Sequence, residues 1–242
     1  MNFILDLHCH TVISGHAYST ISENAAHAAS IGLTHMGIAD HGPKMLGGAN
    51  LYHFLNLRAL PDTIHGVKIL QGAEANILNI NGELDLPDYA LERLDFVIAS
   101  MHREIILTSD CASNTKAMVN AMESPHMHIL GHPNSITYAI DIEAMVKAAA
   151  KTKTIIEINE GSLIPGLFRY PGDEPFIETL ALCKEYNVSV LASSDSHFAT
   201  HVGEFTRAKS FIESSGIPEE LVVNTSPQRL LDAIKAKKEL MS

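Results

Sequence analysis

Six short apolar runs in this chain each end close to a histidine or a carboxylate. The first run, residues 3–7, leads directly into His8, and the one-residue gap to His10 places both imidazoles on one face of an extended chain. The other runs, with the side chains that follow them, are 36–39 with Asp40 and His41, 68–72 with Glu74, 96–100 with His102, 127–131 with His132, and 189–192 with Asp195 and His197. In a barrel of parallel strands the C-terminal strand ends meet at one mouth. The pattern therefore predicts a single metal-binding site at those strand ends.

Segments with helical signals separate the strands. Thr20, with Glu23 three residues later, has the pattern of a capping box and opens an Ala-rich helix that ends at Gly32. Asp141 opens a second helix before a further apolar run at residues 154–158. Three more helices are expected at 174–186, 207–215 and 227–240. Seven strands, near residues 3, 35, 68, 96, 127, 155 and 189, thus alternate with helices, which favours a closed, mostly parallel α/β barrel.

One segment interrupts this alternation. Asn81-Gly82, between apolar residues at 77–78 and 84–86, predicts a type I′ hairpin after the third strand. We expect this hairpin to decorate the rim of the barrel.

Length and composition predict one domain spanning residues 1–242. The chain is 46% hydrophobic, and no Pro-, Gly- or Ser-rich linker divides it. No apolar stretch approaches the roughly 20 residues that a membrane span needs, and the first residues lack the basic region of a signal peptide. We therefore expect a cytoplasmic protein without membrane contact. The three cysteines lack metal-ligand spacing, and their odd number favours reduced thiols.

The candidate ligands occur as short motifs in a fixed order: HxH at His8 and His10, then His16, DH at Asp40-His41, Glu74, His102, HP at His132-Pro133, and DSH at Asp195-Ser196-His197. In this order they resemble the PHP (polymerase and histidinol phosphatase) superfamily. The resemblance extends from His8 to the segment at 224–227, and it is closest to the small single-domain bacterial phosphatases of the YcdX type, through residues 114–118 and 157–159. It implies a distorted (β/α)7 TIM-like barrel that binds three divalent metal ions, most commonly Zn²⁺ and in some members Mn²⁺ or Fe²⁺, and that hydrolyses phosphoric esters.

The resemblance also implies three ligand sets, with Glu74 shared between the first two: His8, His10, Glu74 and Asp195; Glu74, His102 and His132; and His16, His41 and His197. Imidazole and carboxylate together suit zinc and neighbouring transition metals. Glu74, Asp195 and His197 are expected to act in catalysis. In the expected mechanism a water between the two Glu74-linked ions is deprotonated and attacks phosphorus in line, while the third ion holds a phosphate oxygen.

Basic residues near the mouth are candidates for binding the substrate phosphate. Arg103 follows a candidate ligand directly, and Arg169 and Lys44 fall in loops expected at the mouth. A surface ion pair with Glu104 is an equally good interpretation for Arg103.

For several other residues near the candidate ligands, a structural role is an alternative to a role at the site or the expected one. Asp6 and Asp40 would either orient imidazoles or cap loops. Cys9 is expected to be a small buried hydrophobic residue, because alternation turns it away from the ligands. The remaining histidines are expected to be structural or solvated, with His201 the closest of them to the mouth: His27, His35, His53, His65, His126, His128 and His201.

The formal net charge of -11 argues against a nucleic-acid duplex as the main partner, because binding to the phosphate backbone needs a basic surface. Three divalent ions would offset about six negative charges and make the mouth locally positive. A small phosphorylated substrate fits this charge distribution better than a polymer does. The sequence leaves the oligomeric state open, a homo-oligomer included.

Metal-dependent hydrolysis of a small phosphomonoester is the leading functional hypothesis. Within the resembled family the alternatives are a histidinol-phosphate phosphatase and a nucleotide or oligonucleotide phosphoesterase. An amidohydrolase would share HxH on the first strand but would carry a carboxylated lysine where this chain has Glu74, and Lys68 lies at the wrong end of that strand. A non-catalytic metal-binding protein is the alternative of a different class. Loss of ligands would indicate it, and no ligand position is missing.

Overall fold

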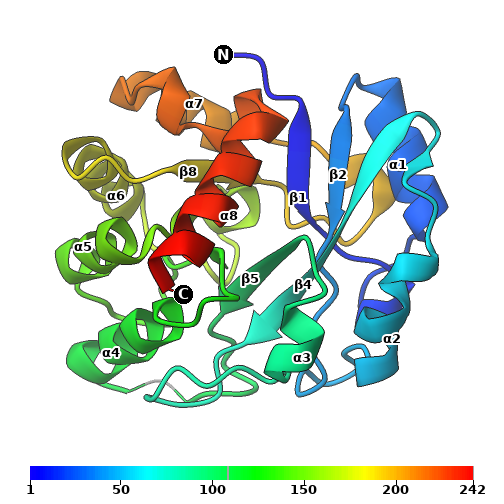
Figure 1. Ribbon diagram of the computed structural model, residues 1–242. Coiled ribbons are helices and arrows are strands. Elements are labelled where there is room, and N and C mark those ends of the chain that lie inside the picture. Colours follow the sequence, from blue (N-terminus) through cyan, green and yellow to red (C-terminus); the bar gives the residue numbers. More distant parts are fainter. Residues whose placement is uncertain (108, 242) are drawn as a thin grey trace.

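The computed structural model describes residues 1–107 and 109–241. Within these residues eight strands form one sheet, and seven of them run parallel in the order β1-β2-β4-β5-β6-β7-β8 (Figure 1). The strands are β1 (Leu5–Cys9), β2 (His35–Ile38), β3 (Thr63–Ile64), β4 (Val67–Asn76), β5 (Phe96–Ser100), β6 (Ile129–Leu130), β7 (Ile155–Asn159) and β8 (Val190–Ser193). The sheet curls around an apolar interior and forms a distorted (β/α)7 barrel, as predicted.

Hydrogen bonds between the first and last parallel strands nearly close the barrel. The His10 amide donates to the Ser196 carbonyl at 2.9 Å, just beyond the ends of β1 and β8. Nearer the other end, the Asn224 side chain accepts from the Ala192 amide at 2.7 Å and donates to the Leu5 carbonyl at 3.1 Å. A carboxamide suits this position because it offers both a donor and an acceptor. These contacts hold β1 and β8 together where no regular ladder joins them.

Eight α-helices within the described residues surround the barrel (Figure 1). They are α1 (Ile21–Ser30), α2 (Leu51–Asn56), α3 (Asp88–Leu91), α4 (Cys111–Met122), α5 (Ile142–Thr152), α6 (Glu174–Glu185), α7 (Thr206–Ser215) and α8 (Pro227–Met241). In the described ranges no helix has both the length and the hydrophobicity needed to cross a bilayer.

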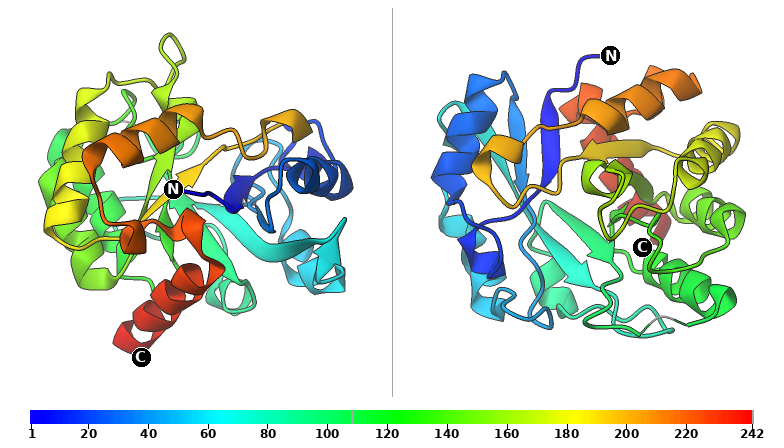
Figure 2. Two further views of the ribbon diagram at one scale, coloured as in Figure 1. Left: turned by 90° about the horizontal axis from the view of Figure 1, so that it is seen from above. Right: turned by 180° about the vertical axis from the view of Figure 1, so that it is seen from behind.

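The last helix, α8, covers the amino-terminal end of the barrel. Its Leu230 and Ile234 join the apolar cluster inside the barrel, which includes Leu5 and Ile98. This helix lies across the front in Figure 1 and largely behind the strands in the right panel of Figure 2. The opposite end, formed by the loops that follow the strands, is therefore left free for a site.

A β-bulge in β1 allows Leu7 and Cys9 to lie in different apolar clusters. The register with β2 shifts between Asp6 and Cys9. Leu7 belongs to the cluster inside the barrel, whereas Cys9 belongs to the cluster between barrel and helices. Strict alternation would place these two residues on one face, and a bulge breaks that alternation. Cys9 is 1% exposed, which agrees with the prediction of a buried thiol.

Most predicted elements are present, and their capping residues act as expected. The Thr20 hydroxyl accepts from the Glu23 amide, and the Glu23 carboxylate accepts from the Thr20 amide, so the capping box that begins α1 is confirmed. Asp141 caps α5 through the Ala144 amide. Helices α2, α3 and α4 are not predicted: α2 and α3 are only six and four residues long, and the first half of α4 contains Ser, Asn and Thr, which have low helix propensity.

The prediction of a type I′ turn at Asn81-Gly82 is wrong. The segment does turn back through an antiparallel bridge, but Gly82 alone of this pair has a positive φ, 78°, and its amide donates to the Asn79 carbonyl. A type I′ turn needs positive φ at both central residues. That geometry occurs at His65 and Gly66, with φ of 51° and 83°, in the two-residue turn between β3 and β4.

Candidate metal centre

The structure brings all nine predicted ligand residues together at the carboxyl end of the barrel. Each comes from a strand end or the loop that follows it, in agreement with the pattern in the sequence. Their positions are His8 in β1, His10 after β1, His16 after the short 3-10 helix η1 (Val12–Ser14), His41 after β2, Glu74 in β4, His102 after β5, His132 after β6, and Asp195 and His197 after β8.

Glu74 lies at the centre of the cluster, fully buried. Its Oε1 is 2.9 Å from His132 Nε2, 3.3 Å from His102 Nε2 and 3.4 Å from His8 Nε2. Its Oε2 is 2.6 Å from His41 Nδ1. Burial alone would raise the pKa of Glu74, but His102, His8 and His41 outweigh burial and hold this pKa well below its ordinary value. The carboxylate is therefore ionised, and its two oxygens face different imidazoles.

A second group of imidazoles lies beside the first. The His10 ring centroid is 4.3 Å from those of His41 and His197, and His16 Nε2 is 3.2 Å from His41 Nε2. Burial, followed by the neighbouring His41, lowers the pKa of both His10 and His16. A neutral imidazole keeps a lone pair for a metal ion.

Asp195 joins the cluster to a buried arginine. Its Oδ1 is 3.2 Å from His10 Nε2, and its Oδ2 accepts a short hydrogen bond from Arg169. Burial would raise the pKa of Asp195, but Arg169 and then His8 hold it well below its ordinary value. Asp195 and His132 have φ of 52° and 26°, a region that non-glycine residues rarely adopt. Such backbone strain often accompanies functional sites.

The donor atoms fit divalent transition metals. Four buried atoms that face the centre make no hydrogen bond within the described chain: His8 Nε2, His10 Nε2, His41 Nδ1 and Glu74 Oε2. The close pair formed by His41 and Glu74 is thus not aligned as a hydrogen bond. Unpaired polar atoms are costly in a protein interior, and imidazole nitrogen with carboxylate oxygen is a zinc donor set. Three groups bring their donor atoms within 4.8 Å of one another: His8, His10 and Glu74; His41, Glu74 and His102; and His10, His41 and His197.

These groups overlap with the ligand sets implied by the resemblance but divide the residues differently. The first group, His8 with His10 and Glu74, falls within the first implied set. His41 faces Glu74 through Nδ1 and His16 through Nε2, so it lies between two sets. His132 contacts Glu74 but belongs to none of the three groups.

Glu157 is a site residue that the sequence analysis did not identify. Its Oε1 is 2.6 Å from His8 Nδ1, and its Oε2 accepts from the His132 amide at 2.5 Å. Both contacts leave the Nε2 atoms of these histidines facing Glu74. The signal was present, because Glu157 is a charged residue inside the apolar run 154–158 and such residues are seldom buried without a partner.

Two further contacts orient imidazoles of the cluster. Asn76 Oδ1 is 2.7 Å from His102 Nδ1. Asp40 accepts from the Ser14 hydroxyl at 2.7 Å, and Ser14 Oγ is 3.0 Å from His10 Nδ1. Asp40 therefore supports an imidazole indirectly, through a serine.

Asp6 and the remaining histidines have other roles. The Asp6 carboxylate accepts from the Gly203 amide at 2.9 Å, from the amide and hydroxyl of Ser194, and from the backbone amide of His8. It therefore connects β1 to the loop after β8, and none of these contacts is with an imidazole ring. His53 lies in α2, and its Nε2 is 3.2 Å from an Asp40 oxygen. His128 accepts from the Val97 amide, and His201 is exposed.

The candidate phosphate-binding residues differ in their surroundings. Arg169 has a side chain that is 19% exposed and is held by Asp195. Arg103 is 63% exposed and pairs with Glu104 at 2.9 Å. Both guanidinium groups lie 5.5 Å from the ring centroid of Phe168. Lys44 is exposed. Arg169 is thus the one of these residues in direct contact with the cluster.

Comparisons with known proteins agree with this geometry. The sequence model of the PHP domain matches residues 6–237. Three bacterial proteins named "Probable phosphatase" align over nearly the whole chain. One from Clostridium botulinum (strain Langeland) is 40% identical over 240 residues, one from Acetivibrio thermocellus is 41% identical over 239 residues, and one from Thermoanaerobacter sp. (strain X514) is 44% identical over 239 residues. The first two alignments cover 99% of this chain and 98% of the relative, and the third covers 98% and 97%.

A solved structure has the same fold. It is the histidinol phosphate phosphatase of Lactococcus lactis, in complex with zinc, L-histidinol and phosphate, with a TM-score of 0.60 and 16% identity. The alignment covers 88% of this chain and 94% of that one. Because the family model and these relatives match almost the full length, the chain belongs to the PHP domain family.

Proposed function

We propose that this protein is a metal-dependent hydrolase of a small phosphomonoester. The observation that carries the proposal is the buried, ionised carboxylate of Glu74, which lies among imidazoles. Three imidazole nitrogens and one oxygen of Glu74 face the centre of this cluster and lack hydrogen-bond partners in the described chain. The names of the relatives in the PHP family, "Probable phosphatase", support the reaction class.

Three divalent ions would be held by His8, His10, Glu74 and Asp195, by Glu74, His102 and His132, and by His16, His41 and His197. Zn²⁺ suits this imidazole and carboxylate set best, and Mn²⁺ and Fe²⁺ also accept it. Bound cations of this kind supply a water of lowered pKa, about 7 on zinc, and neutralise charge on phosphoryl oxygens.

The other residues of the centre position these donors. Glu157 accepts from His8 at Nδ1 and so leaves Nε2 as the ligand atom. Asn76 does the same for His102. Arg169, fixed by Asp195 and partly exposed, would donate to an oxygen of the bound phosphate, since a guanidinium forms strong charge-assisted hydrogen bonds with phosphate.

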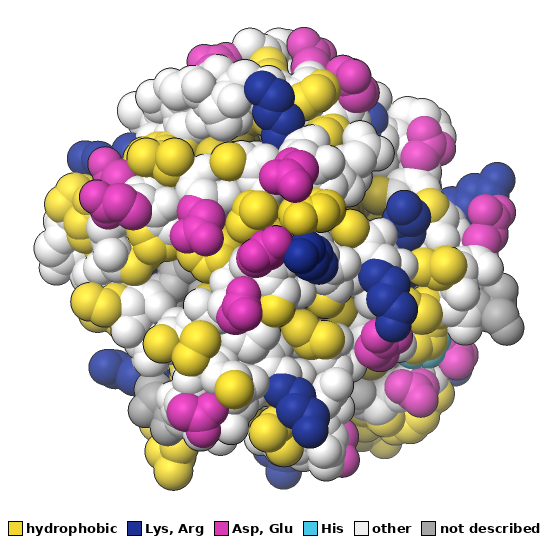
Figure 3. Space-filling view, turned by 90° about the vertical axis from the view of Figure 1, so that its left-hand side faces the viewer, with side chains coloured by type: hydrophobic (Ala, Val, Ile, Leu, Met, Phe, Trp, Pro, Cys, Tyr) yellow, Lys and Arg dark blue, Asp and Glu magenta, His cyan; other side chains and the backbone are white. Residues whose placement is uncertain are grey.

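The net charge and one face of the molecule support a small substrate over a nucleic acid. The chain has a net charge of -11. On the face that includes α4, α5 and α6, basic side chains are interspersed with acidic and apolar ones and form no continuous stripe (Figure 3). Binding along a phosphate backbone depends on such a basic stripe.

The test is a comparison of two chromogenic esters with the zinc-loaded protein. Hydrolysis of p-nitrophenyl phosphate should be at least about 10-fold faster, in kcat/KM, than hydrolysis of bis(p-nitrophenyl) phosphate, because an arginine and cations at the mouth favour the doubly charged monoester. Faster hydrolysis of the diester would indicate a phosphodiesterase, and hydrolysis of neither ester would contradict the proposal.

A further inference from the structure

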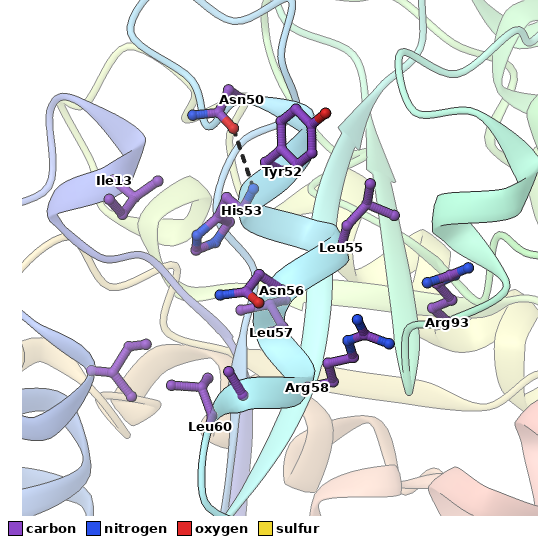
Figure 4. Close-up of a pocket in the computed structure, with 12 residues that line it drawn as sticks. Ile13, Asn50, Tyr52, His53, Leu55, Asn56, Leu57, Arg58, Leu60 and Arg93 are labelled. Atoms are coloured by element: carbon purple, nitrogen blue, oxygen red, sulfur yellow. Dashed lines mark hydrogen bonds between the residues drawn. The ribbon is translucent and has the colours of Figure 1, made fainter.

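A cavity of about 720 Å³ opens on the side of the barrel (Figure 4). Its walls come from η1, the start of α1, α2, the 3-10 helix η2 (Leu57–Ala59) and the residue Arg93 beyond α3. None of the nine candidate ligands lines it. It is therefore separate from the metal centre described above.

Two arginines give this cavity a positive charge. Arg58 and Arg93 line it, and no aspartate or glutamate does. Neither guanidinium group has an ion pair, hydrogen bond or ring contact within residues 1–107 and 109–241, whereas those of Arg103, Arg169 and Arg229 each pair with a carboxylate. In a chain of net charge -11, two unpaired guanidinium groups on an acid-free wall leave an anion as the complementary ligand.

The rest of the wall is largely apolar. In Figure 4 the two arginines lie on the right of the cavity and Ile13 on the left. Leu57 and Leu60 lie in the region between the arginines and Ile13. Ile13 is 44% exposed, so part of this apolar surface faces solvent. A ligand that fills the cavity would thus combine a charged end with an apolar body.

We propose that this cavity binds a small amphiphilic anion, with its carboxylate, phosphate or sulfonate group at Arg58 and Arg93 and its apolar part against Leu57, Leu60 and Ile13. The site adjoins the network that supports His10. His53 lines the cavity and contacts Asp40. The Asp40 carboxylate accepts from the Ser14 hydroxyl, which in turn contacts His10 Nδ1.

The test uses the fluorescent dye 8-anilinonaphthalene-1-sulfonate, which has a sulfonate and an apolar body, with the metal-loaded full chain. R58Q and R93Q should each bind the dye about 10-fold more weakly than the wild type, because each loses a charge-assisted contact. R207Q removes an exposed arginine outside the cavity and should bind the dye like the wild type. Octanoate should displace the dye at a lower concentration than octanol, which lacks the charge.

Equal dye affinity in the wild type, R58Q and R93Q would overturn the proposal, and so would equal losses in R58Q and R207Q. Displacement by octanol as effective as that by octanoate would also contradict it, because the arginines would then play no part. Both arginines are exposed and unpaired, so circular dichroism should show folded variants. The measurement needs no turnover, and its result is independent of the proposed phosphatase activity.

Discussion

The two carboxylate oxygens of Glu74 face different imidazoles, and this division makes Glu74 the most sensitive residue of the centre. Oε1 faces His8, His102 and His132, and Oε2 faces His41. An amide in its place keeps the shape but offers one oxygen and no charge.

Glu74→Gln should lower kcat for p-nitrophenyl phosphate by more than about 100-fold, since even residues that only orient metal ligands cost about 10- to 100-fold. Circular dichroism should show an unchanged fold. An unchanged turnover number would contradict the bridging role.

Glu157 offers a test of orientation without loss of a ligand. Glu157→Gln weakens the charged partner of His8 Nδ1, and we expect about a 10- to 100-fold loss of zinc affinity, measured by competition with a chelating dye. Glu160→Gln is the matched control. Glu160 is also a buried glutamate of this segment, but it accepts from the amides of Arg207 and Ala208 at the start of α7 and contacts no candidate ligand. Equal zinc affinity in the wild type and Glu157→Gln would show that this contact is only structural.

Arg169 and Arg103 form a second matched pair. Arg169→Ala should lower kcat/KM for p-nitrophenyl phosphate by about 100-fold, because a charge-assisted contact at the cluster is lost. Arg103→Ala should stay within about threefold, since an exposed pair such as Arg103 and Glu104 contributes little. The reverse order of effects would move phosphate binding to Arg103.

At the scale of elements, α8 is tied to the ends of two other helices by one lysine. Lys237 is fully buried, and its Nζ donates to the carbonyl of Met122 at 2.8 Å and to that of Thr152 at 3.3 Å. These are the last residues of α4 and α5, where carbonyls lack partners within the helix and a cation is favourable.

Lys237→Met should lower the free energy of unfolding at pH 7 by about 1–3 kcal/mol, because two helix ends lose their donor. Lys238→Met, at an exposed neighbour, should change it by less than about 0.5 kcal/mol. Urea denaturation at equal metal content measures both. Equal stability of the two variants would contradict the capping role.

The same lysine predicts a dependence on pH. Burial lowers the pKa of Lys237 from 10.5 to about 8 in the folded state. Below pH 8 Lys237 is protonated in both the folded and the unfolded state, so the free energy of unfolding is lowered by the full cost of burying the charge. Between pH 8 and 10.5 the unfolded state holds more protons, and the free energy of unfolding contributed by Lys237 rises with pH. The stability difference between the wild type and Lys237→Met should therefore grow across this window, and a constant difference would contradict the shift.

Local sequence signals predicted much of the fold and of the cluster, and tertiary contacts determined the rest. Thr20 and Asp141 cap helices through neighbours a few residues away, so their sequence patterns suffice. Asn224 closes the barrel through contacts with residues far away in the chain, and no local pattern reveals them. The contact of Glu157 with His8, 149 positions away, likewise depends on barrel closure.

The prediction of a type I′ turn from the sequence was wrong for a physical reason. Asn-Gly favours a type I′ turn, but at Asn81-Gly82 the longer hairpin loop takes another form, and the turn arises at His65-Gly66. The Leu78 amide donates to the Glu83 carbonyl, so residues 79–82 form a four-residue loop, and Asn81-Gly82 is not the central pair of a two-residue turn.

For the whole molecule, the barrel brings nine ligand-type residues from distant parts of the sequence to one end, while α8 covers the other. Three divalent ions at that end would offset about six of the negative charges of the chain. Metal binding and attraction of an anionic substrate would thus depend on the same residues.

The most direct test of this account is metal content by elemental analysis of protein purified without chelator or metal-affinity resin, paired with p-nitrophenyl phosphate hydrolysis before and after metal removal. We predict about three transition-metal ions per chain, loss of hydrolysis on removal, and recovery when zinc is restored. Protein that hydrolyses the ester equally well without metal, or that binds no transition metal, would contradict the account.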